Sequence, residues 1–333
     1  MAKKQGKRRH ARPVERHRDR TPAKSRQQIK APPLEDTFPS AATLLRFTIF
    51  DADSHGLLNA ALGKFKPLLM LRDGKKIAQI KRAETAVELV DLAATATGAA
   101  EPAWHERVRQ LDTAEIVPVI AQRLPALTKI RDRDEQDKLT EEYIGALRWH
   151  GAAGTTTLLQ HFNGLHTYGQ SVACVVLGLL GAEAAGDEIW RFYKEVVGKR
   201  QESYFVGALW GLIDLQDERA GQALADLLRK RRHFYELFGF LALAGDERAI
   251  LPLVERLARA AEDERTNEMM ALLSISHRIG REALIEVFAE TSMTKEEAVT
   301  AADNILAQPA EAAEEYFALF FRSLTAEDLG RIL

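Results

Sequence analysis

The sequence predicts an all-α fold, an α-solenoid of stacked antiparallel helical hairpins preceded by a disordered basic N-terminal tail. A repeated phrase carries this prediction: residues 244–254 have an earlier copy at residues 215–225, both contain Asp-Glu-Arg-Ala, and both stand between apolar helical stretches. Self-similarity at about 30 residues is typical of helical units that bury their apolar faces only against neighbouring units. In addition, no alternating pattern runs long enough to predict a sheet.

Residues 1–38 are predicted to form the tail and its linker. Residues 1–30 carry twelve Lys or Arg against Glu15 and Asp19, a net charge of +10, whereas the remaining residues carry 34 against 46, a net of −12. So few apolar side chains cannot offset the entropy lost on ordering. The composition fits three alternatives: the tail binds a polyanion, it is simply solvated, or it rests on the acidic remainder of the chain. The residues that would bind phosphates by releasing counterions are Lys3, Lys4, Lys7, Arg8, Arg9 and Arg12.

Residues 39–140 predict an irregular helical part, either a degenerate early section of the array or a separate cap. Helices are expected at residues 41–50, 57–71, 77–97, 104–111 and 114–130. The charged residues 131–137 are expected to form a loop or an exposed helix start. Residues 116–120 echo residues 250–254, which indicates that the array begins upstream in a less regular form.

Residues 141–290 are predicted to form five consecutive hairpins, followed by a C-terminal helical cap at residues 291–333. The first helices are expected at residues 143–149, 171–180, 204–213, 235–244 and 268–275. Each second helix carries an apolar pair at i, i+4, which places both side chains on one face. These pairs are spaced 31, 35, 29 and 31 residues apart: Leu158 and Phe162, Ile189 and Tyr193, Leu224 and Leu228, Leu253 and Leu257, and Leu284 and Phe288.

The residue types of the phrase match the start of a helix. Asp217 and Asp246 are predicted N-caps, because their carboxylates accept free amides and meet the positive end of the helix dipole. Pro252 falls in the first turns, where a missing amide costs least. Gly245 is expected to permit the tight turn between helices.

On these residues the segment resembles HEAT repeats, in particular the bacterial phycobilisome-lyase HEAT-like subgroup. The resemblance is clearest over residues 245–257, weaker over residues 217–228, and extends loosely over residues 141–290. It implies an α-solenoid that acts as a protein-binding scaffold, and it brings no catalytic residues. A bilin lyase or isomerase activity would rest on the name of the subgroup alone.

Short motifs give little reason to propose an enzyme or a cofactor. Asp51 and Asp53 follow an apolar run, as in haloacid-dehalogenase-like phosphotransferases, but that chemistry needs a parallel sheet. The same residues with Gly56 resemble the start of an EF-hand loop, yet Leu62 stands where a bidentate Glu belongs. We interpret Asp51 and Asp53 as part of an Asx turn that follows the end of a helix.

Neither the histidines nor the single cysteine forms a metal-binding pattern. His150, His161 and His166 are not spaced as an i, i+4 zinc pair, so they are expected to be ordinary interhelical residues. Cys174, inside an apolar run, is expected to be a buried core residue. No phosphate loop or nucleophile elbow is present. The sequence therefore predicts a non-catalytic protein with no metal or cofactor.

The remaining candidate for function is the surface of the second helices, which the HEAT resemblance implies is the partner-binding side. The outward positions of residues 217–232 and 247–262 are expected to contact a partner. Basic residues gather there, which is compatible with helix-dipole stabilisation as well as with binding. The candidate partner-binding residues are Arg229, Lys230, Arg231, Arg232, Arg256 and Arg259.

Two functional hypotheses follow. The first is a scaffold that binds a protein or peptide through the solenoid surface; the alternative is a nucleic-acid-associated protein that uses the tail and the basic repeat edge. The chain has no apolar run of about 20 residues and no signal-peptide core, so we expect a cytoplasmic protein without a membrane span.

Overall fold

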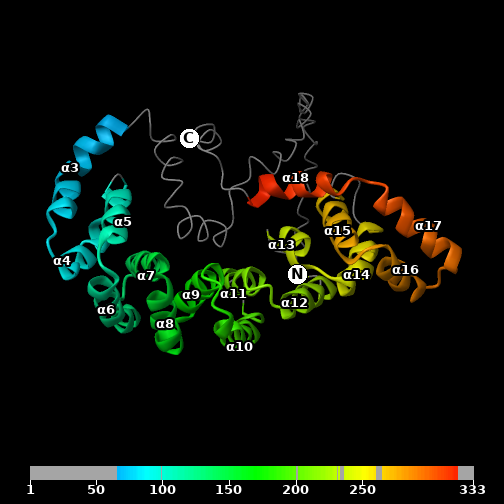
Figure 1. The fold of residues 1–333 in the computed structure, drawn as a ribbon, viewed down its shortest axis with the longest axis horizontal. Coiled ribbons are helices and arrows are strands. Elements are labelled where there is room, and N and C mark those ends of the chain that lie inside the picture. The colour runs from blue at the N-terminus through cyan, green and yellow to red at the C-terminus, as the bar shows by residue number, and fades with distance from the viewer. Residues whose placement is uncertain are drawn as a thin grey trace, which may run out of the picture. The chain divides into compact units, whose positions relative to one another are not determined.

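The computed structural model describes residues 66–98, 100–199, 202–230, 232, 236–259 and 265–321, and every regular element in these ranges is a helix (Figure 1). The all-α prediction is therefore confirmed for the described residues. They belong to one compact unit, Phe38–Leu333. The predicted tail, the helix expected at residues 41–50 and most of that at residues 57–71 lie outside the described ranges. None of the described helices is long and apolar enough to cross a membrane.

The N-terminal helices divide differently from the prediction. A single helix was expected at residues 77–97, but a capping box starts a new helix inside it. The Thr85 side chain accepts the amide of Glu88 at 3.2 Å, and the Glu88 carboxylate accepts the amide of Thr85 at 3.3 Å. The elements here are α3 (Lys66–Arg82), α4 (Ala86–Asp91), η2 (Ala93–Thr95), α5 (Ala100–Gln110), α6 (Thr113–Arg123) and η3 (Leu124–Lys129).

The charged stretch before the repeats is a helix start, one of the two alternatives expected. The Asp132 side chain accepts the amide of Glu135 at 3.0 Å, so α7 begins at Arg133 and runs to Leu147. The elements that follow are η4 (Arg148–His150), α8 (Gly151–His161), η5 (Phe162–Gly164), α9 (Thr167–Leu179), η6 (Glu183–Ala185), α10 (Gly186–Val196), α11 (Glu202–Asp214), α12 (Arg219–Arg229), α13 (Leu237–Ala244), α14 (Glu247–Leu257), α15 (Thr266–Ile279), α16 (Arg281–Ala289), α17 (Lys295–Leu306) and α18 (Ala310–Phe321).

Helices that are two apart in the sequence pack against each other through much of this region. Helix α9 contacts α7 and α11, and α13 contacts α15; among the second helices, α14 contacts α12 and α16. The C-terminal helix α18 packs on α15 and α13. The expected apolar pairs supply the buried stripe, although Phe162 lies in η5 rather than in α8, and Leu257 is only half-buried.

Helices α9 and α11 pack closely, because both carry small residues at the contact. A Cβ atom added to Gly207 would lie 2.1 Å from Ser171 Oγ, and one added to Gly211 would lie 2.5 Å from the carbonyl oxygen of Cys174. Cys174 is fully buried in this seam, and burial raises the pKa of its thiol. It is therefore an inert core residue, as expected.

The repeated phrase behaves as predicted at one copy and differently at the other. Asp246 is the N-cap of α14, and its Oδ1 accepts the amide of Arg248 at 3.0 Å. Asp217 makes the same bond to the amide of Arg219, but α12 has Glu218 as its N-cap, so the expected cap lies one residue early.

Gly245 has a different role from the one expected. Its φ is −65°, which any residue can adopt, so the turn does not require glycine for conformational freedom. An added Cβ would instead lie 2.5 Å from the carbonyl oxygen of Leu241 and 2.6 Å from Ile275 Cδ1. Close approach of α15 requires the glycine.

Gly207→Ala should lower the free energy of unfolding by about 1–3 kcal/mol or more, because the added methyl group would push α9 and α11 apart. Gly74→Ala is the matched control, since Gly74 lies within α3 with nothing within 4 Å of an added Cβ. There the better helix propensity of Ala should stabilise by up to about 1 kcal/mol. Urea unfolding measures both; equal effects would contradict the packing described.

Candidate functional site

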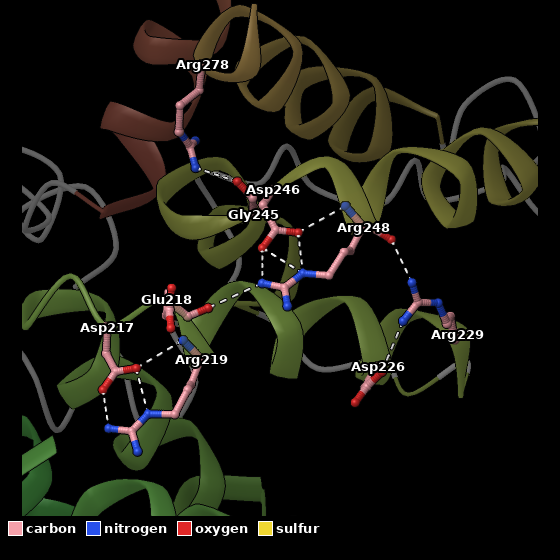
Figure 2. Close-up of polar contacts among 9 residues, drawn as sticks. All are labelled: Asp217, Glu218, Arg219, Asp226, Arg229, Gly245, Asp246, Arg248 and Arg278. Atoms are coloured by element: carbon pink, nitrogen blue, oxygen red, sulfur yellow. Dashed lines mark hydrogen bonds and ion pairs between the residues drawn. The ribbon is translucent and has the colours of Figure 1, made fainter. Parts of the chain in front are cut away.

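The Asp-Glu-Arg phrase forms an ion pair at the start of each of two second helices (Figure 2). Arg219 Nη2 lies 2.5 Å from Asp217 Oδ2, and Arg248 Nε lies 3.0 Å from Asp246 Oδ1. The bond from Arg219 lowers the pKa of Asp217. We call each arrangement an Asp-Arg clamp: one carboxylate accepts both the backbone amide and the guanidinium of the arginine two residues later.

Both clamps also reach the helix that lies two before their own in the chain. Arg219 Nη1 donates to Asp187 Oδ1 at 2.7 Å, at the start of α10. Arg248 Nη2 donates to the carbonyl oxygen of Glu218 at 3.4 Å, at the start of α12 (Figure 2). A glycine makes room for each carboxylate. A Cβ added to Gly221 would lie 2.2 Å from Asp246 Oδ2, and one added to Gly186 would lie 3.1 Å from Asp217 Oδ2.

Two further arginines tie these helices together (Figure 2). Arg229, at the end of α12, donates from Nη2 to the carbonyl oxygen of Arg248 at 3.0 Å and pairs with Asp226 at 3.0 Å. Arg278, on α15, donates to the carbonyl oxygen of Gly245 at 2.8 Å. Burial lowers the pKa of Arg278. The relative placement of α12, α14 and α15 is thus fixed by charged hydrogen bonds as well as by apolar contact.

A groove of about 710 Å³ is lined by residues of α12, α14 and α16 and of the segments that follow α14 and α16. Four apolar side chains, Leu228, Leu251, Pro252 and Val287, contribute to its lining, which contains more apolar than polar surface. Its charged lining residues are Arg229, Glu247, Arg248, Glu255, Arg256, Arg259 and Glu290. Three of the six arginine and lysine residues expected to contact a partner are therefore brought together here.

All four arginines of the groove already have a carboxylate partner. Besides the pairs of Arg229 and Arg248, Arg256 Nε lies 2.8 Å from Glu268 Oε1 and Arg259 Nη2 lies 3.5 Å from Glu255 Oε2. By contrast, Glu247 and Glu290 form no ion pair within the described part of the chain. The groove therefore offers little unpaired positive charge to a partner, although the arginines at residues 229–259 predict a basic surface.

The other candidate residues do not join this group. Arg232 Nη2 donates to the carbonyl oxygen of Val197 at 3.2 Å, and its guanidinium carbon lies 5.6 Å from the ring centre of Phe205. Lys230 is exposed at the end of α12. Arg231 and the six tail residues, Lys3, Lys4, Lys7, Arg8, Arg9 and Arg12, lie outside the described ranges, as do Asp51 and Asp53.

Two of the three histidines considered as metal ligands form hydrogen bonds within the described residues, and each of the two bonds to a different threonine. His150 Nδ1 is 3.0 Å from Thr113 Oγ1, and His166 Nε2 is 2.9 Å from Thr140 Oγ1. Burial lowers the pKa of both imidazoles. His161, the third, is half-buried at the end of α8.

A buried polar cluster joins α5 and α7 and was not predicted from the sequence. His105 Nε2 lies 2.6 Å from Glu142 Oε2, Lys138 Nζ donates to Glu142 Oε1 at 3.0 Å, and Glu101 Oε2 lies 3.9 Å from the same Nζ. Burial acts to raise the pKa of Glu142, but its bonds to His105 and Lys138 outweigh that effect and lower the pKa. Glu101 and His105 share a helix face, whereas Glu142 is 37 residues from His105, too far for a local pattern to link them.

One ligand atom from each of Glu101, His105 and Glu142 lies within 4.8 Å of the others, which is close enough for three residues to share a metal ion. However, the ammonium of Lys138 already supplies a positive charge to both carboxylates. It also donates to the carbonyl oxygen of Ala96 at 2.7 Å, so the lysine is held in place from a second direction. We therefore interpret the cluster as an internal ion-pair network that joins α5 to α7.

Glu141, beside this cluster, has an unusual pKa. Burial raises the pKa to about 7, although the hydroxyl of Tyr168, which donates to the Glu141 carboxylate, acts to lower it. The carboxylate of Glu142 also acts to raise it. Burial, and then the contact with Glu141, raise the pKa of Tyr168.

Comparison with models of protein families, with curated proteins and with solved structures finds no match for the chain.

The pH dependence of stability should reveal Glu141. Its folded-state pKa, about 7, lies above the ordinary value of 4.5, so its contribution to stability is full below about pH 4.5 and is lost as the pH rises through 7. Glu141→Gln keeps an acceptor for Tyr168 and should remove this loss, so the variant should be more stable than the parent by on the order of 2–3 kcal/mol at pH 8 and equal to it near pH 4.

Urea unfolding at a series of pH values measures this difference. Glu115→Gln, at an exposed position on α6, is the control and should leave the pH profile of the parent unchanged. If the profiles of Glu141→Gln and the parent ran parallel, the raised pKa of Glu141 would be disproved.

Proposed function

We propose that this chain is a non-catalytic scaffold that binds a segment of a partner protein in the groove of α12, α14 and α16. The observation that carries the proposal is the combination of an apolar lining, formed by Leu228, Leu251, Pro252 and Val287, with charges that are mostly paired. Clefts that recognise peptides commonly gain affinity from apolar contacts and orientation from a few polar groups.

We further propose that the groove belongs to a HEAT-like α-solenoid. In support, α7, α9, α11, α13 and α15 contact one another in sequence order, and α12, α14 and α16 do the same. The Asp-Arg clamp recurs at the start of α12 and of α14 and contacts the preceding second helix each time. Such repetition of one interface is how solenoids extend a binding surface.

The pairing of the arginines favours a protein partner over a polyanion for this groove. Phosphate groups would have to draw Arg248 from Asp246 and Arg256 from Glu268, and the Glu268 side chain is only 5% exposed. A buried carboxylate without its cation is costly. Nucleic-acid association would therefore depend on the tail and not on the groove.

A photo-crosslinking amino acid at Leu251, which lies in the groove, tests the proposal in cells that express the full chain. We expect discrete protein adducts that are absent when the crosslinker replaces Met269, a residue of α15 that is 51% exposed. Val287→Lys should remove the adducts, because it places a charge on the apolar lining. Thermal melting of this variant checks that the chain still folds. Identical adducts at both positions, or adducts to nucleic acid alone, would contradict the proposal.

A further inference from the structure

We infer that the partner segment presents aliphatic side chains flanked by Lys or Arg. The inference rests on the proposed function, because it specifies the chemistry of the segment that the groove of α12, α14 and α16 would bind. Three features of the groove lead to it: the carboxylates that form no ion pair within the described residues, the arginines that do form one, and the apolar surface that lines the groove beside them.

The first feature is the position of the unpaired carboxylates. Glu247 is the first residue of α14 and Glu290 follows the last residue of α16; both are exposed and both line the groove. Neither forms an ion pair within the described residues, so each is available to a cation of the partner. Glu255 pairs with Arg259 at 3.5 Å; because both side chains are exposed the pair is weak, and because it holds one charge of each sign it favours neither a basic nor an acidic segment.

The second feature is the occupation of the guanidinium groups. Arg248 is held by Asp246 and by the carbonyl oxygen of Glu218, and Arg229 by Asp226 and by the carbonyl oxygen of Arg248. Arg256 is held by Glu268 and lies over the ring of Phe238, 5.2 Å from its centre. An acidic segment would have to replace these contacts, whereas a basic segment leaves them intact.

The third feature is the apolar surface that lines the same groove as the two glutamates. Leu251 and Pro252 on α14 and Val287 on α16 are partly exposed toward the groove. Their cover by aliphatic side chains supplies affinity in proportion to the area removed from water. Pairing of Glu247 and Glu290 with basic side chains then fixes the position of the segment in the groove and accelerates association.

Fluorescence anisotropy with the full chain and three short labelled peptides tests the inference. The peptides have a Leu-Ile centre flanked by Lys and Arg, the same centre flanked by Glu, and an Ala-Ala centre flanked by Lys and Arg. We expect the first to bind about tenfold more tightly than either of the others, because only it satisfies both the apolar surface and the carboxylates.

The double variant Glu247→Gln/Glu290→Gln should weaken binding of the first peptide by about tenfold. The control is Glu195→Gln/Glu296→Gln, which removes two exposed carboxylates from α10 and α17 and should leave the affinity unchanged. An equal loss in both variants would mean that the peptide is attracted only by the general negative charge, and would overturn the inference.

Tighter binding of the Glu-flanked peptide, or no binding of any peptide, would also overturn the basic-partner chemistry. In either case the crosslinking at Leu251 decides separately whether the groove binds protein. If adducts persist there, the proposed function stands and only the partner chemistry is wrong; if they are absent as well, both fail.

Discussion

The placement of α12 and α14 depends on an aspartate at the start of each helix, whose carboxylate lies against a glycine of the helix two before it in the chain. Asp246 fixes its own helix start by accepting the amide of Arg248, and the same carboxylate orients that guanidinium toward the preceding unit. Gly221 leaves the space that the carboxylate occupies. One local motif thus starts a helix and also sets its distance and register relative to its neighbour.

This constraint determines the chemistry of the groove. The charges that hold α12 and α14 in place are those of Arg229 and Arg248, and both residues also line the groove. Because folding already engages these guanidinium groups, the charges left for a partner are carboxylates. A run of arginines in a helical repeat therefore indicates a basic surface only when the carboxylates that accompany it are located as well.

Features that depend on neighbours within one helix could be predicted from the sequence, and features that join separate helices could not. The cap of α14 at Asp246, the start of α12 to within one residue and the apolar pairs follow local rules of capping and periodicity. The bond from Arg248 to the preceding unit and the pairing of His105 with Glu142 cross 30 and 37 residues. At Gly245 the sequence predicts a turn, whereas the glycine is required by the close approach of α15, because turns and close approaches select the same residue type.

A double-mutant cycle between Gly221→Ala and Asp246→Ala tests the dependence on the carboxylate and the glycine most directly. In the parent, Gly221→Ala should lower the free energy of unfolding by about 1–3 kcal/mol, because its methyl group displaces the carboxylate. In the Asp246→Ala background the same substitution should cost almost nothing. An equal cost in both backgrounds would contradict the dependence and place the clash at the carbonyl oxygen of Ala244, 3.0 Å from the added Cβ.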